Sequence, residues 1–178
     1  VQEDVRPQLE ELLIGTEITV TSGRNSLLEE AGRDDVDLMM NGLVGAAGME
    51  PTIEAIKNGV DVALSNKESV VMAGEIINDL LERHSCNLFP VDSEHSAIHQ
   101  CLSKKIDNSE DVRKLILTGT GGPFFFKSLK HFSRITPEEA IKHPVWSMGK
   151  KISVDSATMM NKGLEVIEAR WLFKLTAD

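Results

Sequence analysis

The sequence predicts an α/β fold in which helices cover a parallel sheet. Short runs of β-branched or apolar residues alternate with helical patterns, and these runs are apolar almost throughout. Continuous apolar runs are typical of strands buried on both faces, as in sheets with helices on each side. We therefore expect residues 1–89 to form part of a doubly wound domain.

The expected elements of residues 1–89 follow from periodicity and from residues that begin or end helices. Pro51 stands in the first turn of a helical pattern and Gly59 follows its last turn, which is the usual placement of these residue types. The expected strands are 16–21, 36–41 and 60–64, and the expected helices are 25–32, 51–57 and 68–84. The chain also begins without Met and inside a helical pattern at 8–13, so we expect it to be part of something longer.

The pattern changes after the apolar, strand-like run 88–91. Glycine and polar residues become more frequent and the regular alternation ends, so we expect a boundary near residue 90 and a second domain over residues 90–178. Its expected elements are a strand at 113–118, a glycine-rich loop at 119–123, a short helix at 137–142 and a long helix at 156–173.

The composition excludes several classes of protein. With 19 Lys and Arg against 28 Asp and Glu, the net charge is −9, which disfavours nucleic acid as a partner. A 41% apolar share is too high for a disordered chain, and no apolar run is long enough to span a bilayer. Two cysteines cannot build a disulfide scaffold, so we expect a reducing, cytosolic compartment.

Two carboxylates, Asp92 and Glu94, follow the run 88–91. Because alternate residues of an extended chain point the same way, we expect both at the sheet edge where α/β proteins bind ligands. Two convergent carboxylates favour a hard divalent cation. A solvated turn ahead of a helix has the same pattern and is the more common case, so a third oxygen ligand is needed to decide.

The segment 156–165 offers that ligand together with an anion site. Asn161 and Glu165 lie one turn apart on a helical face, Lys162 stands beside them, and Ser156 is the expected N-cap. Hydroxyl, amide and ammonium donors can hold a phosphate there, while Glu165 can join the two carboxylates above. A capped helix with a solvated Lys and Glu explains the segment equally well.

Two features give weaker signals for ligand binding. The loop 119–123 can bring backbone amides and the Thr120 hydroxyl to an anion, although most glycine loops are ordinary turns. Lys67 follows a strand and opens a helix, so either a ligand or an ion pair is its natural partner. A structural role for this lysine is the more usual one.

The segment 143–148 has the composition of a lid that closes over a small ligand. It combines a titratable donor, His143, with a large apolar side chain, Trp146. A loop held in place by a buried Trp would have the same composition. His95 and His99 are four residues apart but lack the glutamate of a zinc-protease helix, so we interpret them as structural or surface histidines.

Four segments resemble the 1-deoxy-D-xylulose 5-phosphate reductoisomerase family. They are ALSNKES at 63–69, PVDSEHSAI at 90–98, GTGGPF at 119–124 and KISVDSATMMNKGLE at 151–165. They occur in the family's order, and the resemblance covers most of residues 36–173. That family converts 1-deoxy-D-xylulose 5-phosphate to 2-C-methyl-D-erythritol 4-phosphate in the non-mevalonate isoprenoid pathway with NADPH and Mg²⁺, Mn²⁺ or Co²⁺. It is the target of fosmidomycin.

The resemblance implies a role for each residue that matches a family motif. The metal ligands would be Asp92, Glu94 and Glu165, and the phosphate ligands would be Thr120, Ser156, Asn161 and Lys162. Lys67 and Ser93 would contact substrate oxygens or orient the metal site. His143–Met148 would form the lid, with Trp146 packing on the substrate. Asn66 and Glu68 would lie on the cofactor side, and Met148 and Gly149 would face the nicotinamide. The catalytic residues would be Lys67, Glu94, His143 and Glu165.

The resemblance also implies domains, partners and a compartment. Residues 1–89 would be the C-terminal part of a Rossmann-like NADPH-binding domain, and residues 90–178 an α+β catalytic domain with a metal site and a lid. We expect the family's glycine-rich pyrophosphate turn and its C-terminal helical domain to lie outside this chain. The expected partners are a sugar-phosphate substrate and, in the full-length protein, a second copy, with neither nucleic acid nor membrane. The compartment would be the bacterial cytoplasm or the plastid stroma.

Two residues depart from the family pattern. Thr120 stands where Ser is usual, which adds a methyl group beside the phosphate, and Phe125 stands where Arg usually follows GGPF. Neither departure removes a metal ligand. Two alternatives to the enzyme remain: a fragment that binds metal and sugar phosphate without catalysis, and an ordinary doubly wound binding domain in which the three carboxylates lie apart.

Overall fold

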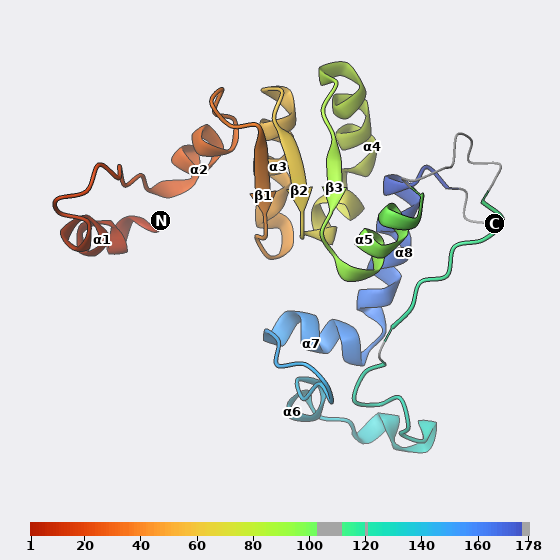
Figure 1. Cartoon of the computed structure of the whole chain (residues 1–178). Helices are drawn as coiled ribbons and strands as arrows, with labels where there is room; N and C mark the ends of the chain where they lie inside the picture. Colours follow the sequence, from red (N-terminus) through yellow and green to blue (C-terminus); the bar gives the residue numbers. More distant parts are fainter. Residues whose placement is uncertain (103–111, 120, 176–178) are drawn as a thin grey trace. The chain divides into compact units, whose positions relative to one another are not determined.

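A computed structural model describes residues 1–102, 112–119 and 121–175 (Figure 1). The chain divides into two compact units, Val1–Val91 and Asp92–Asp178. Within the described residues, no helix is both long and apolar enough to cross a membrane.

The first unit is built on a parallel sheet. Its strands are β1 (Leu38–Asn41), β2 (Asp61–Leu64) and β3 (Leu88–Pro90), which lie side by side in that order (Figure 1). The register pairs Asn41 with Leu64 and Leu64 with Pro90, so all three strands end at one edge of the sheet. The predicted α/β class is confirmed, and so are the predicted strands at 36–41, 60–64 and 88–91.

Two helices supply most of the apolar core around the sheet. α3 (Met49–Lys57) packs against β1, β2 and α4, and it buries Ala55 and Ile56 completely. α4 (Lys67–His84) buries Val70 and Ile77 through their spacing of about two turns, and it ends at Ser85 in the left-handed conformation. Each helix buries one apolar face, which explains why the helical periodicity of apolar residues predicted both α3 and α4.

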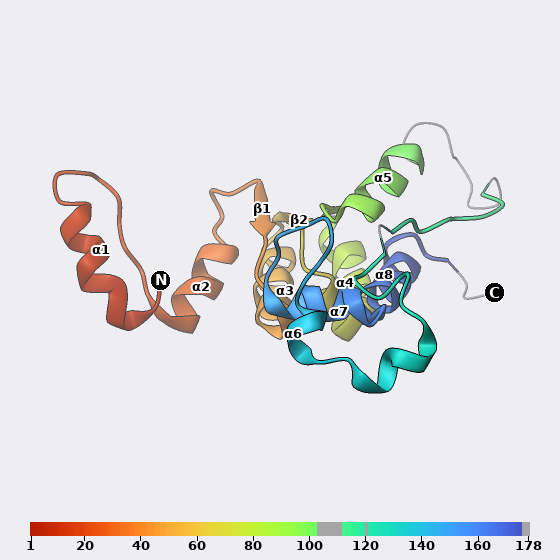
Figure 2. The ribbon, with the colours of Figure 1, turned by 90° about the horizontal axis from the view of Figure 1, so that it is seen from below.

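The remaining α-helices of the first unit lie beyond β1, and the short turn η2 (Gly45–Gly48) packs against α3 and α4. α2 (Gly23–Ala31) packs against α3, and α1 (Arg6–Leu12) follows the short turn η1 (Glu3–Val5). Figures 1 and 2 both show α2 near β1 and α1 farther from the sheet.

The strand predicted at 16–21 is wrong. Residues 17–22 have no regular secondary structure and pair with none of the three strands, and Ile18 is 63% exposed. β-branched residues favour an extended backbone, but a strand also needs a neighbour whose hydrogen bonds it can share.

The described part of the second unit is helical. Its elements are α5 (Ser93–Leu102), η4 (Leu129–Arg134), α6 (Pro137–Ala140), α7 (Lys150–Ala157) and α8 (Met160–Leu172). The predicted strand at 113–118 is also wrong, because this extended segment pairs with no described strand.

The long helix predicted at 156–173 is two helices, α7 and α8. The Thr158 hydroxyl donates to the carbonyl of Val154 at 2.9 Å, and Met159 adopts a left-handed conformation with φ of 62°. A side chain that bonds back to the preceding turn competes with continuation of the helix, and this signal was present in the sequence. Ser156 therefore lies in the last turn of α7, and its predicted position as an N-cap is wrong.

Candidate functional site

Asn66 organises the loop that leaves the edge of the first unit's sheet. Its Oδ1 accepts the backbone N–H of Ser69 at 2.8 Å, which caps α4. Its Nδ2 donates to the carbonyls of Gly45, at 2.9 Å, and Leu43. A Cβ atom at Gly48 would approach the Asn66 side chain to 2.9 Å, so only glycine fits there. The amide thus holds the loop 42–48 against the start of α4.

The loop 42–48 is a feature that sequence reasoning missed. Its sequence, GLVGAAG, directly follows β1, and a glycine-rich turn after a strand is a signal for close approach of the backbone to a ligand. The loop begins at the carboxyl edge of the sheet, where doubly wound folds bind nucleotides. Lys67 and Glu68 start α4 from the same edge, and Lys67 is 7% exposed.

Replacing Asn66 with Asp is expected to destabilise the first unit by about 2 kcal/mol. The carboxylate keeps the cap of α4 but loses the two N–H donors and turns an oxygen toward the carbonyls of Leu43 and Gly45. Chemical denaturation followed by circular dichroism measures the loss. Asn58→Asp is the matched control, because Asn58 is an exposed amide in the same unit. An equal effect of both changes would contradict a special role for Asn66.

The second unit begins with the two predicted carboxylates, but not in the predicted geometry. Glu94 lies in the first turn of α5, so the argument from alternation along a strand is wrong. Asp92 instead precedes α5, and its backbone carbonyl accepts the N–H of Ser96 at 2.8 Å. Only Val91 and Asp92 separate β3 from α5, because Ser93 and Glu94 suit the first turn of a helix.

Lys162 joins the carboxylates of Glu94 and Glu165. Its ammonium donates to Glu94 Oε1 at 3.0 Å, to Glu165 Oε2 and to the backbone carbonyl of Thr118. Glu165 is 1% exposed, whereas Glu94 and Lys162 are about one-fifth exposed. Residues from α5, from the extended segment before 119 and from α8 therefore meet at one ammonium group.

The contacts keep both ends of the ion pair charged. Partial burial raises the pKa of Glu94, but hydrogen bonds from Ser93 and Lys162 outweigh it and lower the pKa to about 2. Burial likewise opposes the charge on Lys162, but the hydrogen bonds to Glu165 and Glu94 raise its pKa. At neutral pH Glu94 is therefore a carboxylate and Lys162 an ammonium.

A cavity of about 200 Å³ opens beside this cluster. Asn161, Lys162 and Ser156 line it together with the glycine loop. A Cβ atom at Gly122 would lie 2.7 Å from the Ser156 carbonyl, so the loop can approach α7 only as glycine. Since a water molecule occupies about 30 Å³ of liquid, the cavity has room for a phosphoryl group. Thr120, predicted as a phosphate ligand, lies outside the described residues.

Asn161 and Glu165, which the sequence places one turn apart on one helical face, are bonded to each other in α8. Asn161 Nδ2 donates to Glu165 Oε1 at 2.5 Å, as expected for residues one helical turn apart. Asn161, a predicted phosphate ligand, is thus hydrogen-bonded to Glu165, a predicted metal ligand.

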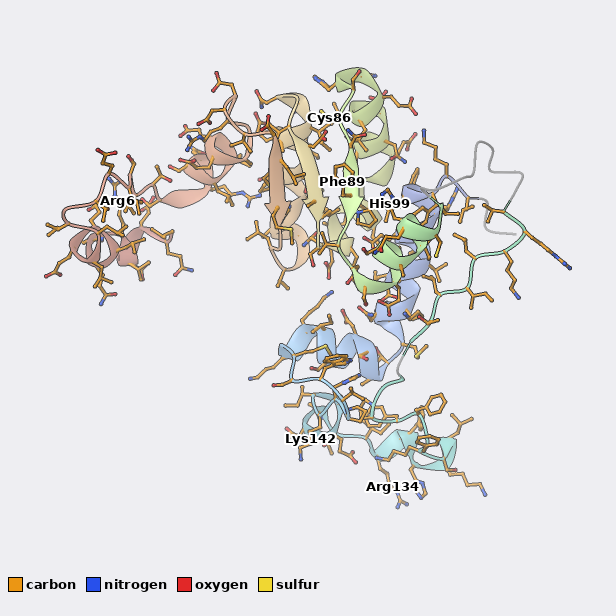
Figure 3. The ribbon with its side chains drawn as sticks, in the orientation of Figure 1. Arg6, Cys86, Phe89, His99, Arg134 and Lys142 are labelled. Atoms are coloured by element: carbon orange, nitrogen blue, oxygen red, sulfur yellow. The ribbon has the colours of Figure 1, made fainter. Side chains whose placement is uncertain are left out.

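The segment 143–148 is organised by His143. Its Nδ1 accepts the backbone N–H groups of Trp146 at 2.9 Å and Val145 at 3.2 Å, so the ring proton lies on Nε2. Trp146 is 59% exposed, which excludes the alternative of a loop held by a buried Trp. Lys142 precedes this segment (Figure 3). An exposed indole on an irregular segment is available to pack on a ligand.

His95 and Glu168 form a buried pair that sequence reasoning missed. His95 Nε2 lies 2.9 Å from the carbonyl of Glu165, and Nδ1 lies 3.3 Å from Glu168 Oε2, with both side chains at most 1% exposed. Ligand atoms of Asp92, His95 and Glu168 lie within 4.8 Å of one another, a spacing that could hold a metal ion. The interpretation of His95 as structural agrees with its burial, whereas nothing local in the sequence indicated Glu168.

The site therefore contains acidic and anion-binding groups in one unit. Glu94, Ser156, Asn161 and Lys162 line one cavity. The buried Glu165 is bonded to Asn161 and Lys162, whereas Asp92 lies with His95 and Glu168. Ser93 adds a hydroxyl that donates to Glu94 Oε2 at 2.6 Å. Oxygen ligands suit a hard divalent cation, and hydroxyl, amide and ammonium donors suit a phosphate.

Two family models match the chain. The one described as 1-deoxy-D-xylulose 5-phosphate reductoisomerase matches residues 1–74, and the one described as the C-terminal domain of that enzyme matches residues 88–173. Two similar proteins carry the same description. The one from Chloroherpeton thalassium is 51% identical over 178 residues, which are 100% of this chain and 46% of that protein. The one from Trichlorobacter lovleyi is 51% identical over 172 residues, which are 97% of this chain and 44% of that protein.

Solved structures are similar in fold. A crystal structure of DOX-P reductoisomerase in complex with NADPH, fosmidomycin and magnesium has a TM-score of 0.88 at 43% identity, covering 98% of this chain and 45% of that one. The reductoisomerase from Zymomonas mobilis in complex with NADPH has a TM-score of 0.86 at 43% identity, covering 98% and 44%. The chain spans less than half the length of these relatives.

Proposed function

The chain belongs to the 1-deoxy-D-xylulose 5-phosphate reductoisomerase family, and we propose that it supplies the metal and phosphate sites of that enzyme. The reaction would convert 1-deoxy-D-xylulose 5-phosphate to 2-C-methyl-D-erythritol 4-phosphate with NADPH. One observation carries the proposal: Lys162 and Asn161 bring anion-binding donors into contact with Glu94 and Glu165 beside a cavity of about 200 Å³. A substrate that carries both a phosphate and metal-chelating oxygens needs this combination.

By donor type the proposed metal ligands suit a hard divalent cation, although the structure groups Asp92 with His95 and Glu168 rather than with Glu94 and Glu165. Asp92, Glu94 and Glu165 offer only carboxylate oxygens, and the low pKa of Glu94, about 2, keeps it ionised at physiological pH. A relative is described as a complex with magnesium. Mg²⁺ or Mn²⁺ is therefore the proposed ion, with Co²⁺ as a further candidate.

The remaining roles are proposed residue by residue. Ser156, Asn161, Lys162 and Thr120 would bind the phosphate, and Ser93 and Lys67 would contact substrate oxygens. His143 would donate from Nε2 to the substrate, because its Nδ1 accepts two backbone N–H groups. Trp146 would cover the substrate and exclude water. The residues proposed for the cofactor side are Asn66, Glu68, Met148 and Gly149. Asn66 would act there by holding the loop 42–48 in place.

The domains and the chemistry follow from these roles. Residues 1–89 would belong to the NADPH-binding domain and residues 90–178 to the catalytic domain. When bound, the metal supplies polarisation of substrate oxygens and NADPH supplies the hydride. The chain's own contribution is to anchor the phosphate, so that binding energy remote from the reacting carbons orients the substrate. The bacterial relatives support the cytoplasm as the compartment, and a homodimer of the whole protein stays a prediction.

Calorimetric titration of fosmidomycin into the chain tests the proposed site. Binding is expected with Mn²⁺ and not without it, and Glu94→Gln is expected to weaken it about 10-fold by removing one charged ligand. Glu139→Gln is the matched control, since this carboxylate pairs with Lys127 at 2.6 Å elsewhere in the same unit. Binding that is indifferent to Mn²⁺, or equally weakened by both variants, would contradict the proposal.

A second candidate function is metal and sugar-phosphate binding without turnover. The chain spans less than half the length of its relatives, and this candidate requires only the metal and phosphate groups of the second unit. Oxidation of NADPH in the presence of 1-deoxy-D-xylulose 5-phosphate and Mn²⁺ distinguishes the two. Substrate binding without NADPH oxidation would favour the second candidate.

A further inference from the structure

All three N–H donors of the Lys162 ammonium are used within the chain. An ammonium group has three donors and no acceptor. Its acceptors are Glu94 Oε1, Glu165 Oε2 and the Thr118 carbonyl. Lys162 can therefore bind a phosphate only after at least one of these contacts is broken.

The two carboxylates are also occupied by protein donors. Glu94 Oε2 accepts the Ser93 hydroxyl at 2.6 Å, and Glu165 Oε1 accepts the Asn161 amide at 2.5 Å. The groups proposed to bind the metal and the groups proposed to bind the phosphate are thus bonded to each other. Neither ligand can reach its full set of partners while these internal contacts persist.

We propose that Lys162 is an exchangeable cation: a divalent metal replaces it at Glu94 and Glu165, and the released ammonium then binds the phosphoryl group of the ligand. The proposal rests on the proposed function, since it assigns the metal to these carboxylates. In this scheme Lys162 binds an anion only after the metal has displaced it from Glu94 and Glu165.

The charges of the cluster favour this coupling. Glu94, Glu165 and Lys162 together carry one net negative charge. A phosphate dianion alone would face two carboxylates, whereas a divalent metal alone would face the ammonium at short range. With both ligands bound, each cation has an anion beside it. Each ligand is therefore expected to bind more tightly when the other is present.

The geometry allows the exchange without a change of fold. Lys162 already lines the cavity that also contains Ser156 and Asn161. A Cβ atom at Gly119 would lie 3.1 Å from Lys162 Cε, so the glycine leaves room for the lysine side chain beside the loop. A flexible four-carbon side chain can move its ammonium from the carboxylates to an anion in that cavity by changing rotamers.

Titration of Mn²⁺, followed by the electron paramagnetic resonance signal of free Mn²⁺, tests the exchange. It is carried out with and without methylphosphonate, an anion probe that lacks the metal-chelating oxygens of the substrate. In the wild-type chain, methylphosphonate is expected to tighten Mn²⁺ binding about 10-fold. Without the probe, Lys162→Met is expected to bind Mn²⁺ about 10-fold more tightly than wild type, because the competing cation is gone. Methylphosphonate should then have no effect on the variant.

Lys130→Met is the matched control, because it removes the same charge from an exposed position of the same unit. It is expected to behave as wild type. If Lys162→Met does not fold, as judged by circular dichroism, Lys162→Gln carries the same expectation with two N–H donors retained.

The outcomes separate the exchange from the proposed function. If Lys162→Met binds Mn²⁺ no more tightly than wild type, or if methylphosphonate still tightens its Mn²⁺ binding, the exchange is overturned while the metal site stands. If the wild-type chain binds no Mn²⁺, the proposed function and the exchange are overturned together.

Discussion

Replacing Glu165 with Gln is expected to weaken Mn²⁺ binding by at least about 100-fold, more than the roughly 10- to 100-fold typical of losing an outer-shell partner. Glu165 is 1% exposed, and both of its oxygens face polar groups of the site. Gln has nearly the same shape and keeps an oxygen for the Asn161 amide, so the change removes the charge and the Lys162 contact but preserves the shape of the side chain. The same electron paramagnetic resonance titration measures the effect.

Two comparisons make the Glu165 prediction specific. Glu139→Gln applies the same substitution to the carboxylate that pairs with Lys127 and is expected to leave Mn²⁺ affinity unchanged. Circular dichroism of Glu165→Gln is expected to retain the wild-type helix signal, since α8 keeps its backbone hydrogen bonds. A folded variant with wild-type Mn²⁺ affinity would exclude Glu165 from the metal ligands.

The Glu165 variant also bears on Lys162. Without the carboxylate, the ammonium loses one of its three acceptors, and one N–H donor becomes available to the cavity. Anion binding by Glu165→Gln should therefore depend less on the metal than it does in wild type. In Glu165→Gln the affinity for Mn²⁺ is thus expected to fall, while the affinity for an anion in the absence of metal is expected to rise.

The sequence predicts the sheet of the first unit well because its buried strands are locally apolar in composition. Apolar runs at 36–41, 60–64 and 88–91 become strands, and helical periodicity locates α3 and α4 within about two residues. The runs at 16–21 and 113–118 have similar propensity but form no strand in the described residues. Strand formation depends on a partner distant in sequence, and propensity does not encode that partner.

The site is predicted less completely than the sheet. Helical spacing places Asn161 and Glu165 on one face, and the resemblance brings Glu94 and Lys162 to the same site. Local pattern cannot predict that Lys162 bonds to the carboxylates, because this depends on how α5 and α8 approach each other. The break at Met159 was readable from Thr158, whose hydroxyl bonds to the preceding turn.

Removing one member of the buried His95 and Glu168 pair is expected to destabilise the second unit by about 3–5 kcal/mol. His95→Leu leaves the Glu168 carboxylate without the imidazole at 3.3 Å and the Glu165 carbonyl without its donor at 2.9 Å. The His95 ring also stacks on Phe173, with centroids 6.3 Å apart. Urea unfolding followed by fluorescence measures the cost. A Trp146→Phe background leaves Trp171, in α8, as the sole tryptophan.

A double-mutant cycle separates the pair from simple loss of packing. Glu168→Met alone is expected to destabilise the unit, and the double variant with His95→Leu should lose about 1–3 kcal/mol less than the sum of the two single changes. The double variant leaves no buried carboxylate at this position, so part of the penalty disappears. Strict additivity would show that the two side chains do not interact.

The pair is also expected to affect the metal site, because His95 contacts the backbone carbonyl of Glu165 itself. Loss of that hydrogen bond frees the turn of α8 that carries the proposed ligand, so His95→Gln should weaken Mn²⁺ binding about 10-fold, as for outer-shell partners generally. Ala169→Gly destabilises the same helix by about 1 kcal/mol and leaves the His95 side chain in place. If Ala169→Gly weakens Mn²⁺ binding as much as His95→Gln does, the effect is one of helix stability, and His95 does not position Glu165.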